Sequence, residues 1–152
     1  MTQKALLQVA AIENGTVIDH IPSEKLFDVV RLLHLEQMPH RITVGYNLKS
    51  HKMGRKSIIK ISGKFFTDAE LNILAVAVPN VTLVIIRDYD IVDKKTVTLP
   101  DTLLDIVQCP NPQCITNNEP MRTRFRVLNP TIGLVRCDYC NRETNLNKVS
   151  VK

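Results

Sequence analysis

Two close pairs of cysteines in the last third of the chain have the spacing of a metal site. Its only cysteines are Cys109, Cys114, Cys137 and Cys140, which form C-x4-C, a gap of 22 residues and then C-x2-C. Two such pairs can place four thiolates at the corners of a tetrahedron around one ion. Four protein ligands leave no coordination position open, so the pattern predicts one structural Zn²⁺ ion per chain rather than a catalytic one.

Two other interpretations of the cysteines stay open at the level of sequence. The thiols could form two disulfides or be unrelated buried groups, although the paired spacing and a reducing compartment favour metal. The ion could also be iron, as in rubredoxin-type electron carriers, because iron takes the same four thiolates. A colourless purified protein would exclude iron.

The composition indicates a small protein with an aliphatic core. The chain has 152 residues, 44% of them hydrophobic, and no tryptophan, which suits one average domain or two small ones. The N-terminal segment has no long apolar run, and no stretch approaches the roughly 18 apolar residues of a membrane span. We therefore expect a cytoplasmic protein with no membrane partner.

Positive charge is concentrated in one stretch of the first two-thirds. The formal net charge is +5, and no acidic residue lies between Glu36 and Asp68. For Lys49, Lys52 and Lys64 an ordinary solvated surface is an equally good interpretation. The stretch contains seven basic residues, namely Arg41, Lys49, Lys52, Arg55, Lys56, Lys60 and Lys64.

Lys60 is the most informative of these residues. It lies between two isoleucines in the strand-like segment 56–62, and a lysine on an otherwise apolar strand usually meets an anion. Lys56 shares its side of the segment if a period of two holds, and Lys94 with Lys95 adds two more ammonium groups. Lysines at strand ends suit phosphates as point charges, although the chain has no glycine-rich phosphate loop.

Asp19 and His20 allow two interpretations. They could simply lead into the helix that follows. Alternatively, Asp19 would accept a hydrogen bond from a ribose hydroxyl and His20 would donate towards a phosphate. The residues alone do not decide between the two.

No arrangement of residues points to catalysis. The chain has no nucleophile with a paired base, no HExxH motif and no pair of carboxylates flagged by its surroundings. We therefore predict that the protein is not an enzyme.

The order of the expected elements matches a ferredoxin-like fold. Hydrophobic spacing, turn residues and a capping box at Thr67–Glu70 predict strand, helix, strand, strand, helix, strand, with extra extended pieces. This is the β-α-β-β-α-β pattern of an α+β sandwich with an antiparallel sheet and two helices on one face. The expected strands are 5–13, 16–21, 41–48, 56–62, 81–86 and 88–92, and Ser23 is the expected N-cap of the first helix.

A domain boundary is expected near residues 98–101. We assign residues 1–100 to the sandwich and residues 101–152 to a small β domain of the zinc-ribbon or rubredoxin-like type. A unit of this size buries little apolar surface, so metal affinity would supply much of its folding free energy.

Several motifs together resemble the regulatory chain of aspartate carbamoyltransferase. They are NGTVIDHIP at 14–22, RITVGYNL at 41–48, MGRKSIIKI at 53–61 and CPNPQC with CDYC at 109–140. The resemblance covers nearly the whole chain, and the motifs occur in the family's order. It implies a non-catalytic subunit that binds the effectors CTP, UTP and ATP and transmits feedback control of pyrimidine biosynthesis to a separate catalytic chain.

The resemblance also implies a nucleotide site in the first domain and zinc ligation by the four cysteines. Lys94 and His20 would serve the phosphates, and Lys56 would be a neighbouring charge. The implied nucleotide-binding residues are Ile12, Val17, Asp19, His20, Lys56, Lys60, Tyr89 and Lys94.

The remaining roles concern the sugar and the base. Lys60 and Asp19 would serve ribose and base, and the backbone around Ile12 and Tyr89 would read the exocyclic amine of the base. Asp93 departs from the family's pattern, since a carboxylate in this place would oppose a triphosphate.

Partners are implied in the same way. The segment 41–48 resembles the strand that pairs across a dimer with a second regulatory chain. The second domain would grip the catalytic chain, and Asn111 and Arg142 resemble its polar contacts.

A nucleic-acid-binding zinc-ribbon protein is the competing interpretation. The net positive charge and the acid-free stretch support it. The basic strand, however, lacks the interleaved aromatic residues of a base-stacking platform. We therefore expect no nucleic-acid partner.

Overall fold

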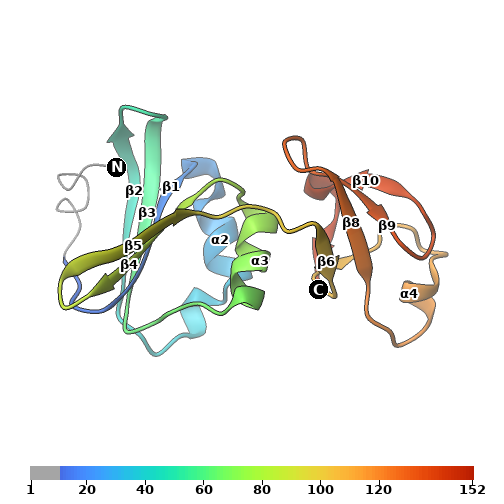
Figure 1. Cartoon of the computed structure of the whole chain (residues 1–152), viewed down its shortest axis with the longest axis horizontal. Coiled ribbons are helices and arrows are strands. Elements are labelled where there is room, and N and C mark those ends of the chain that lie inside the picture. Colours follow the sequence, from blue (N-terminus) through green and yellow to red (C-terminus); the bar gives the residue numbers. More distant parts are fainter. Residues whose placement is uncertain (1–10) are drawn as a thin grey trace. The chain divides into compact units, whose positions relative to one another are not determined.

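The chain divides into two compact units, Met1–Thr98 and Leu99–Lys152. A computed structural model describes residues 11–152 (Figure 1). Most of the strand predicted at 5–13 lies outside the described residues, and residues 11–13 are not in a strand. The two units are described separately below.

The first unit contains one five-stranded antiparallel sheet. Its strands lie side by side in the order β2-β3-β1-β4-β5. The order of the first four in space is that of a ferredoxin-like fold, and β5 adds one more strand beside β4. The strands are β1 (Gly15–Ile21), β2 (Ile42–Ser50), β3 (Gly54–Ser62), β4 (Thr82–Arg87) and β5 (Asp90–Thr96).

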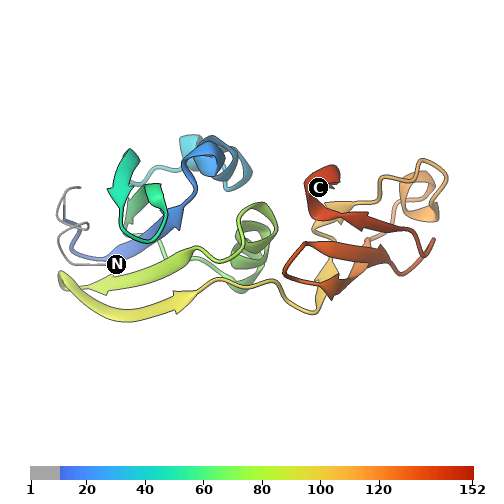
Figure 2. The same ribbon diagram turned by 90° about the horizontal axis from the view of Figure 1, so that it is seen from above.

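Two α-helices, α2 (Leu26–Leu32) and α3 (Asp68–Ala77), lie together on one face of this sheet (Figures 1 and 2). Short 3₁₀ turns at Ser23–Lys25 and Leu35–Gln37 flank α2. The predicted β-α-β-β-α-β order and the predicted placement of both helices on one face are therefore confirmed.

Alternation along the strands gives the sheet two different faces. Successive strand residues point to opposite sides, so a strand covered on one face divides its residues between the helices and the far side. One cluster of buried hydrophobic side chains contains no residue from a helix. It therefore lies on the face of the sheet that the helices do not cover. Its members are Ile12, Val17, Ile58, Val84 and Ile86, with Leu48 packed against them.

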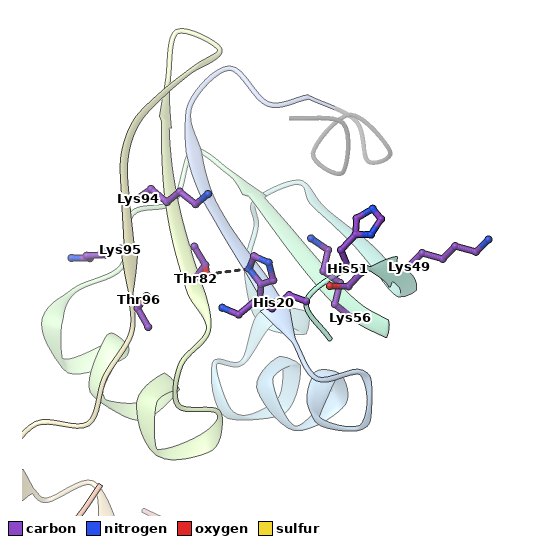
Figure 3. A pocket seen from close by; sticks show the side chains of 10 residues that line it. His20, Lys49, His51, Lys56, Thr82, Lys94, Lys95 and Thr96 are labelled. Carbon is purple, nitrogen blue, oxygen red and sulfur yellow. Dashed lines mark hydrogen bonds between the residues drawn. The ribbon is translucent and has the colours of Figure 1, made fainter. Parts of the chain in front are cut away.

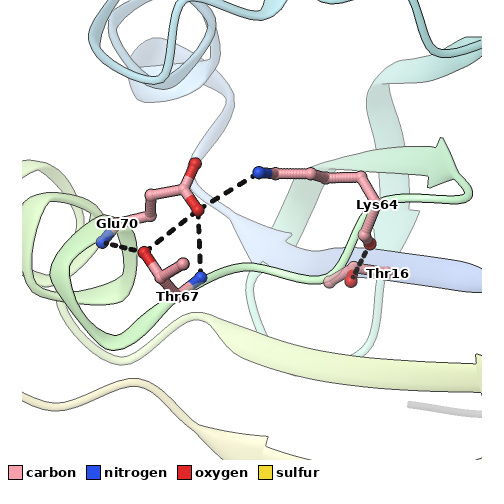
Figure 4. A network of polar contacts seen from close by, with 4 residues as sticks. All are labelled: Thr16, Lys64, Thr67 and Glu70. Carbon is pink, nitrogen blue, oxygen red and sulfur yellow. Dashed lines mark hydrogen bonds and ion pairs between the residues drawn. The ribbon is translucent and has the colours of Figure 1, made fainter.

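The helix starts show one correct and one wrong prediction. Thr67 and Glu70 form the predicted capping box, in which the Glu70 N–H donates to Thr67 Oγ1 at 3.2 Å and the Thr67 N–H donates to Glu70 Oε1 at 3.0 Å (Figure 4). Ser23 is not an N-cap. The segment after Pro22 begins as a 3₁₀ turn without a side-chain cap, and Ser23 Oγ instead lies 3.1 Å from Ser57 Oγ of the sheet.

The second unit is built from short strands. β6 (Thr102–Leu104), β8 (Arg124–Asn129), β9 (Leu134–Cys137) and β10 (Glu143–Asn145) form an antiparallel sheet in the order β10-β9-β8-β6. β7 (Val107–Gln108) pairs with β11 (Ser150–Val151), and α4 (Ile115–Asn118) follows the first cysteine pair. Its buried apolar core is small and consists mainly of Leu103, Val107, Phe125 and Val135.

No helix within residues 11–152 has the length and apolar character needed to cross a bilayer.

The capping box should be measurable in the stability of the first unit. We expect Thr67→Ala to lower the free energy of unfolding by about 1 kcal/mol, because an N-terminal N–H of α3 loses its acceptor. Burial raises the pKa of Glu70, but hydrogen bonds from Thr67 and Lys64 outweigh it and bring the pKa below its ordinary value. The contribution of Glu70 is therefore present at neutral pH and lost as pH falls through the lowered pKa.

Urea denaturation of the full chain, followed by circular dichroism at pH 7 and at pH 3, measures this effect. Asp28→Ala is the control, because it removes an exposed i,i+3 ion pair with Arg31 and should change stability by less than about 0.5 kcal/mol. Equal effects of the two substitutions at pH 7 would contradict the assignment.

Candidate functional site

The four cysteines of the second unit meet around one point. Cys109 follows β7, Cys114 is the N-cap of α4, Cys137 ends β9 and Cys140 lies in the turn after it. The Sγ atoms of Cys109 and Cys140 are 3.7 Å apart, and those of Cys114 and Cys137 are 3.8 Å apart. All four Sγ atoms lie within 4.8 Å of one another.

This geometry fits a tetrahedral ion. With ion–sulfur bonds of about 2.3 Å, the edges of the tetrahedron are about 3.8 Å long. The four thiols are free and lie well beyond the roughly 2.05 Å of a sulfur–sulfur bond. The alternative of two disulfides is therefore wrong, and the residues present fit a metal.

The surroundings of the thiols also indicate a cation. Burial raises the pKa of Cys109 to about 12, so this thiolate does not form at neutral pH without a positive partner. Burial acts in the same direction on Cys140, but hydrogen bonds from the Arg142 N–H, Asn111 and the neighbouring thiols lower its pKa to about 7. A bound divalent cation would remove the cost of placing thiolates in this core.

A basic pocket of about 480 Å³ lies in the first unit, where β1 ends and β4 begins (Figure 3). Among residues 11–152, five lysines, two histidines and no acidic side chain line it, so its potential favours a polyanion. Figure 3 shows Lys94 pointing into the pocket and Lys95 pointing away from it. The lining consists of His20, Lys49, Ser50, His51, Lys52, Lys56, Thr82, Lys94, Lys95 and Thr96.

Two lysines lie in one row across the sheet. Val17 of β1 is paired with Lys60 of β3 and with Val84 of β4. Val84 is paired in turn with Lys94 of β5. Paired residues on neighbouring antiparallel strands share a face, so Lys60 and Lys94 flank the two valines on the face without helices. Lys60 is buried, and this burial lowers its pKa. The negative charge of Asp19 acts in the opposite direction and raises it, but by less.

Asp19 is a fully buried carboxylate beside the pocket. Its Oδ1 lies 2.9 Å from Lys56 Nζ and accepts from the His20 N–H at 2.7 Å. Its Oδ2 lies 3.8 Å from His20 Nδ1 and has no hydrogen-bond partner within the described part of the chain. A buried acceptor of this kind can be satisfied by a hydroxyl group of a ligand.

His20 is held in an unusual backbone conformation. Its φ is 60°, in the left-handed region that residues with a Cβ seldom adopt. The pairing of β1 with β3 is irregular between Ile18 and Ile21, so the strand turns at this point. In this conformation the ring nitrogen Nδ1 of His20 lies 3.1 Å from Thr82 Oγ1. Burial lowers the pKa of His20, and the Asp19 carboxylate opposes that effect.

Ile12 and Tyr89 lie at the opposite end of the sheet from the basic pocket. The Tyr89 N–H donates to the Glu13 carbonyl at 2.8 Å, which brings the segment before β1 against the turn between β4 and β5. Tyr89 is in that turn and not in the strand predicted at 88–92. Ile12 is buried in the cluster with Val17.

The structure thus brings most of the predicted nucleotide residues to one face of the sheet. His20, Lys56 and Lys94 line the pocket, and Asp19 contacts the first two. Lys60 and Val17 continue from it along the sheet, towards Ile12 and Tyr89 at the far end. These placements are geometric, and the role of each residue stays a prediction.

The residues that the sequence did not assign to the site share one feature. They lie at the end of β2, in the turn after it, or at the ends of β4 and β5, which the tertiary fold brings together. Thr82 pairs with Asp19 across the strands, but no sequence signal marks a threonine as a pocket residue. The unassigned lining residues are Lys49, Ser50, His51, Lys52, Thr82 and Thr96.

Asp93 and Lys64 both have partners close to them in the structure. Asp93 Oδ1 accepts from the Lys94 N–H at 2.8 Å, and Asp93 is not among the pocket residues. Lys64 pairs with Glu70 at 3.2 Å beside the capping box (Figure 4). Lys64 is therefore a half-buried, ion-paired residue outside the pocket.

An apolar patch lies along the edge strand β2. Val44 and Tyr46 are 44% and 54% exposed, and Phe27 of α2 is 65% exposed. The rings of Phe27 and Tyr46 pack with centroids 5.7 Å apart. An edge strand with unpaired backbone groups and exposed apolar side chains is a surface for pairing with another chain.

Two family models match the chain in succession. The first is the aspartate carbamoyltransferase regulatory chain, allosteric domain, over residues 7–98, and the second is the metal binding domain of the same regulatory chain, over residues 101–150.

Curated proteins match over nearly their whole length. The aspartate carbamoyltransferase regulatory chain of Bacteroides thetaiotaomicron is 56% identical over 148 residues, 97% of each chain. That of Parabacteroides distasonis is 54% identical over 150 residues, 99% of this chain and 97% of the relative. That of Pyrococcus abyssi is 44% identical over 140 residues, 91% of this chain and 92% of the relative.

The ion pair of Asp19 and Lys56 predicts a large effect of a single substitution. Lys56→Met should lower the free energy of unfolding by about 3 kcal/mol, because it leaves a buried carboxylate without its cation. Lys49→Met is the matched control, because Lys49 is exposed in the same pocket. Urea denaturation of the two variants measures the difference, and equal stabilities would show that the pair does not hold Asp19.

Proposed function

The chain belongs to the family of aspartate carbamoyltransferase regulatory chains and is a non-catalytic allosteric subunit, and from this premise we propose how its two units divide the work. The first unit, assigned to residues 1–100, binds a nucleoside triphosphate on the face of its sheet that has no helices. The second unit, assigned to residues 101–152, holds Zn²⁺ and contacts the catalytic chain. The effectors are CTP, UTP and ATP, and the regulated step belongs to pyrimidine biosynthesis.

The observation that carries this proposal is the row from Lys60 through Val17 and Val84 to Lys94. The row crosses the strands between the basic pocket and the apolar cluster, so this face suits a ligand that is anionic at one end and carries a ring at the other. Along β4, the distance from Thr82 at the pocket to Ile86 near the turn is four residues, or about 13 Å at strand spacing. An extended nucleoside triphosphate spans a comparable length.

Each part of the nucleotide then meets a different group. The phosphates lie in the basic pocket with Lys94, His20 and Lys56. The free Oδ2 of Asp19 accepts from a ribose hydroxyl, and Lys60 lies between ribose and base.

The base occupies the apolar end of the face. Val17 and Ile12 provide apolar contact there, and main-chain groups around Ile12 and Tyr89 read the exocyclic amine of the base.

Regulation requires unequal binding to two quaternary states. A nucleotide with the same affinity for both states would not change the equilibrium between them, however tightly it bound. A coupling free energy of about 1–3 kcal/mol is typical of allosteric proteins and changes activity several-fold. The signal passes through the connection near residues 97–103 to the second unit.

Zinc is the ion that best suits the cysteine cluster. It is redox-inert and takes four thiolates in a tetrahedron, and the sulfur spacing fits that arrangement. When bound, the ion supplies a structural cross-link. A reducing compartment such as the cytoplasm keeps the four thiols available for it.

The partners follow from the exposed surfaces. The second unit exposes apolar side chains that a catalytic chain would cover, with Asn111 and Arg142 as polar contacts. These apolar residues are Leu104, Ile115, Leu128, Ile132 and Tyr139. In the first unit, the segment 41–48 in β2, together with Phe27, forms the dimer contact with a second regulatory chain.

Nucleic-acid binding is less well supported. The lysines converge on one pocket instead of spreading along a groove. Phe65 and Phe66 already carry cations over their rings, since Arg87 lies 4.3 Å from one centroid and Lys64 lies 5.5 Å from the other. They are not open stacking surfaces for bases.

Substitution of the row lysines tests the nucleotide site. We expect Lys60→Ala or Lys94→Ala to abolish the response to CTP and ATP, because each removes a cation from the ligand, and to leave unregulated catalysis intact. Nucleotide titrations of activity in the reassembled enzyme measure this. Lys25→Ala, at an exposed site outside the pocket, is the control, and an unchanged response in both row variants would refute the site.

Removal of the metal tests the second unit. A strong chelator with a mild thiol reagent should unfold this unit, because metal affinity supplies its folding free energy. On a sizing column the assembly should then separate into catalytic trimers and regulatory dimers. An assembly that stays intact after complete loss of metal, measured by elemental analysis, would contradict the proposal.

A further inference from the structure

The segment before β1 is tied to two neighbouring strands by its main chain and one side chain. The Asn14 carbonyl accepts from the Gly63 N–H at 2.8 Å, just after β3. The Asn14 Oδ1 accepts from the Asp88 N–H at 3.1 Å, in the turn between β4 and β5. Glu13 binds the next residue of that turn, since its carbonyl accepts from the Tyr89 N–H at 2.8 Å.

Gly15 explains how this segment comes so close to β3. Its φ is 145°, and a Cβ there would lie 2.1 Å from the Ile61 carbonyl oxygen. Only glycine fits this approach. The segment is therefore pressed against the end of β3, and Asn14 has little freedom to move away from the turn.

The turn itself needs outside support. Asp88 and Tyr89 have φ of 52° and 68°, and they connect Arg87 to Asp90 as a two-residue hairpin loop. Two left-handed residues make a type I′ turn, which favours Asn-Gly or Asp-Gly. Here the second position is tyrosine, which tolerates this conformation poorly. The hydrogen bond from Asp88 to Asn14 holds the turn in it.

Two main-chain acceptors are left next to this contact. Within residues 11–152, no main-chain N–H donates to the carbonyl of Ile12 or of Tyr89. Ile12 directly precedes the acceptor Glu13, and Tyr89 is the donor of the Glu13–Tyr89 hydrogen bond, at the apolar end of the face without helices. The spacing of these two carbonyls depends on how firmly the turn is held against the segment.

We propose that Asn14 is a positioning residue that sets the selectivity for nucleotides whose base carries an exocyclic amine. It acts by fixing the turn, so that the carbonyls of Ile12 and Tyr89 are placed to accept from that amine. This inference rests on the proposed nucleotide site. It assigns the discrimination between amine and keto bases to a side chain that does not touch the ligand.

The test compares three ligands by calorimetry on the full metal-loaded chain. CTP carries the amine, UTP carries a carbonyl in its place, and inorganic tripolyphosphate probes the phosphate end alone. Asn14→Ala should weaken CTP binding about three- to tenfold, as expected for the loss of one hydrogen bond. UTP and tripolyphosphate should change less than twofold, so the ratio of CTP to UTP affinity falls.

Three further variants separate positioning from general damage. Asn14→Asp keeps an acceptor oxygen and should retain the wild-type ratio. Tyr89→Gly, added to Asn14→Ala, should restore the ratio, because glycine adopts the left-handed turn without help. Asn129→Ala removes a comparable exposed acceptor, from the Thr131 N–H of the second unit, and should change nothing.

The outcomes distinguish this inference from the proposed function. If the wild type binds neither CTP nor UTP, the nucleotide site itself is wrong. If the wild type prefers CTP and Asn14→Ala keeps the same ratio, the role of Asn14 is wrong and the site stands. Should Asn14→Ala fail to fold, the double variant with Tyr89→Gly decides: wild-type selectivity supports the inference, and lost selectivity in a folded protein overturns it.

Discussion

The buried carboxylate of Asp19 organises the site of the first unit. An ionised group with no exposed surface is tolerated only if cations and hydrogen-bond donors surround it. Lys56 and the His20 N–H meet one of its oxygens, and the other has no hydrogen-bond partner within residues 11–152. The carboxylate therefore fixes the orientation of a lysine and a histidine at the pocket. Since it is one negative charge among several positive ones, the pocket keeps an excess that an anion can neutralise.

The sheet makes this arrangement possible because its two faces have different tasks. The helix-covered face holds aliphatic side chains such as Ile18, Ile59 and Leu83, which are almost completely buried, and this burial is the main source of stability. The other face contributes less to the core. It combines a small apolar cluster with the buried lysines Lys56 and Lys60. A nucleotide has the same division between a flat apolar base and a charged tail. The proposed nucleotide site would therefore depend on a gradient from charged to apolar side chains along one face and not on a loop motif.

Sequence reasoning succeeded where the determinant is local and failed where it is tertiary. The capping box of Thr67 and Glu70 could be predicted because both partners lie within one turn of the helix. Ser23 looked like an equal candidate, but its hydroxyl meets Ser57 of the sheet, a contact that no local pattern contains. Lys49 and Lys52 could not be told from solvated residues, since only the hairpin of β2 and β3 carries them to the end of β5. The cysteine cluster was predictable because its two close pairs of cysteines have the sequence spacing of a metal site.

The two units differ in the size of the free energies that control them. The first has an aliphatic core covered by two helices. The second has a few large buried side chains, among them Phe125 and Leu103, and a cluster of four thiols in which burial raises the pKa of Cys109 to about 12. Metal binding of this kind is worth about 10 kcal/mol or more, whereas allosteric coupling is about 1–3 kcal/mol. In the proposed function, the ion would therefore decide whether the second unit folds, and the nucleotide would only adjust the balance between quaternary states.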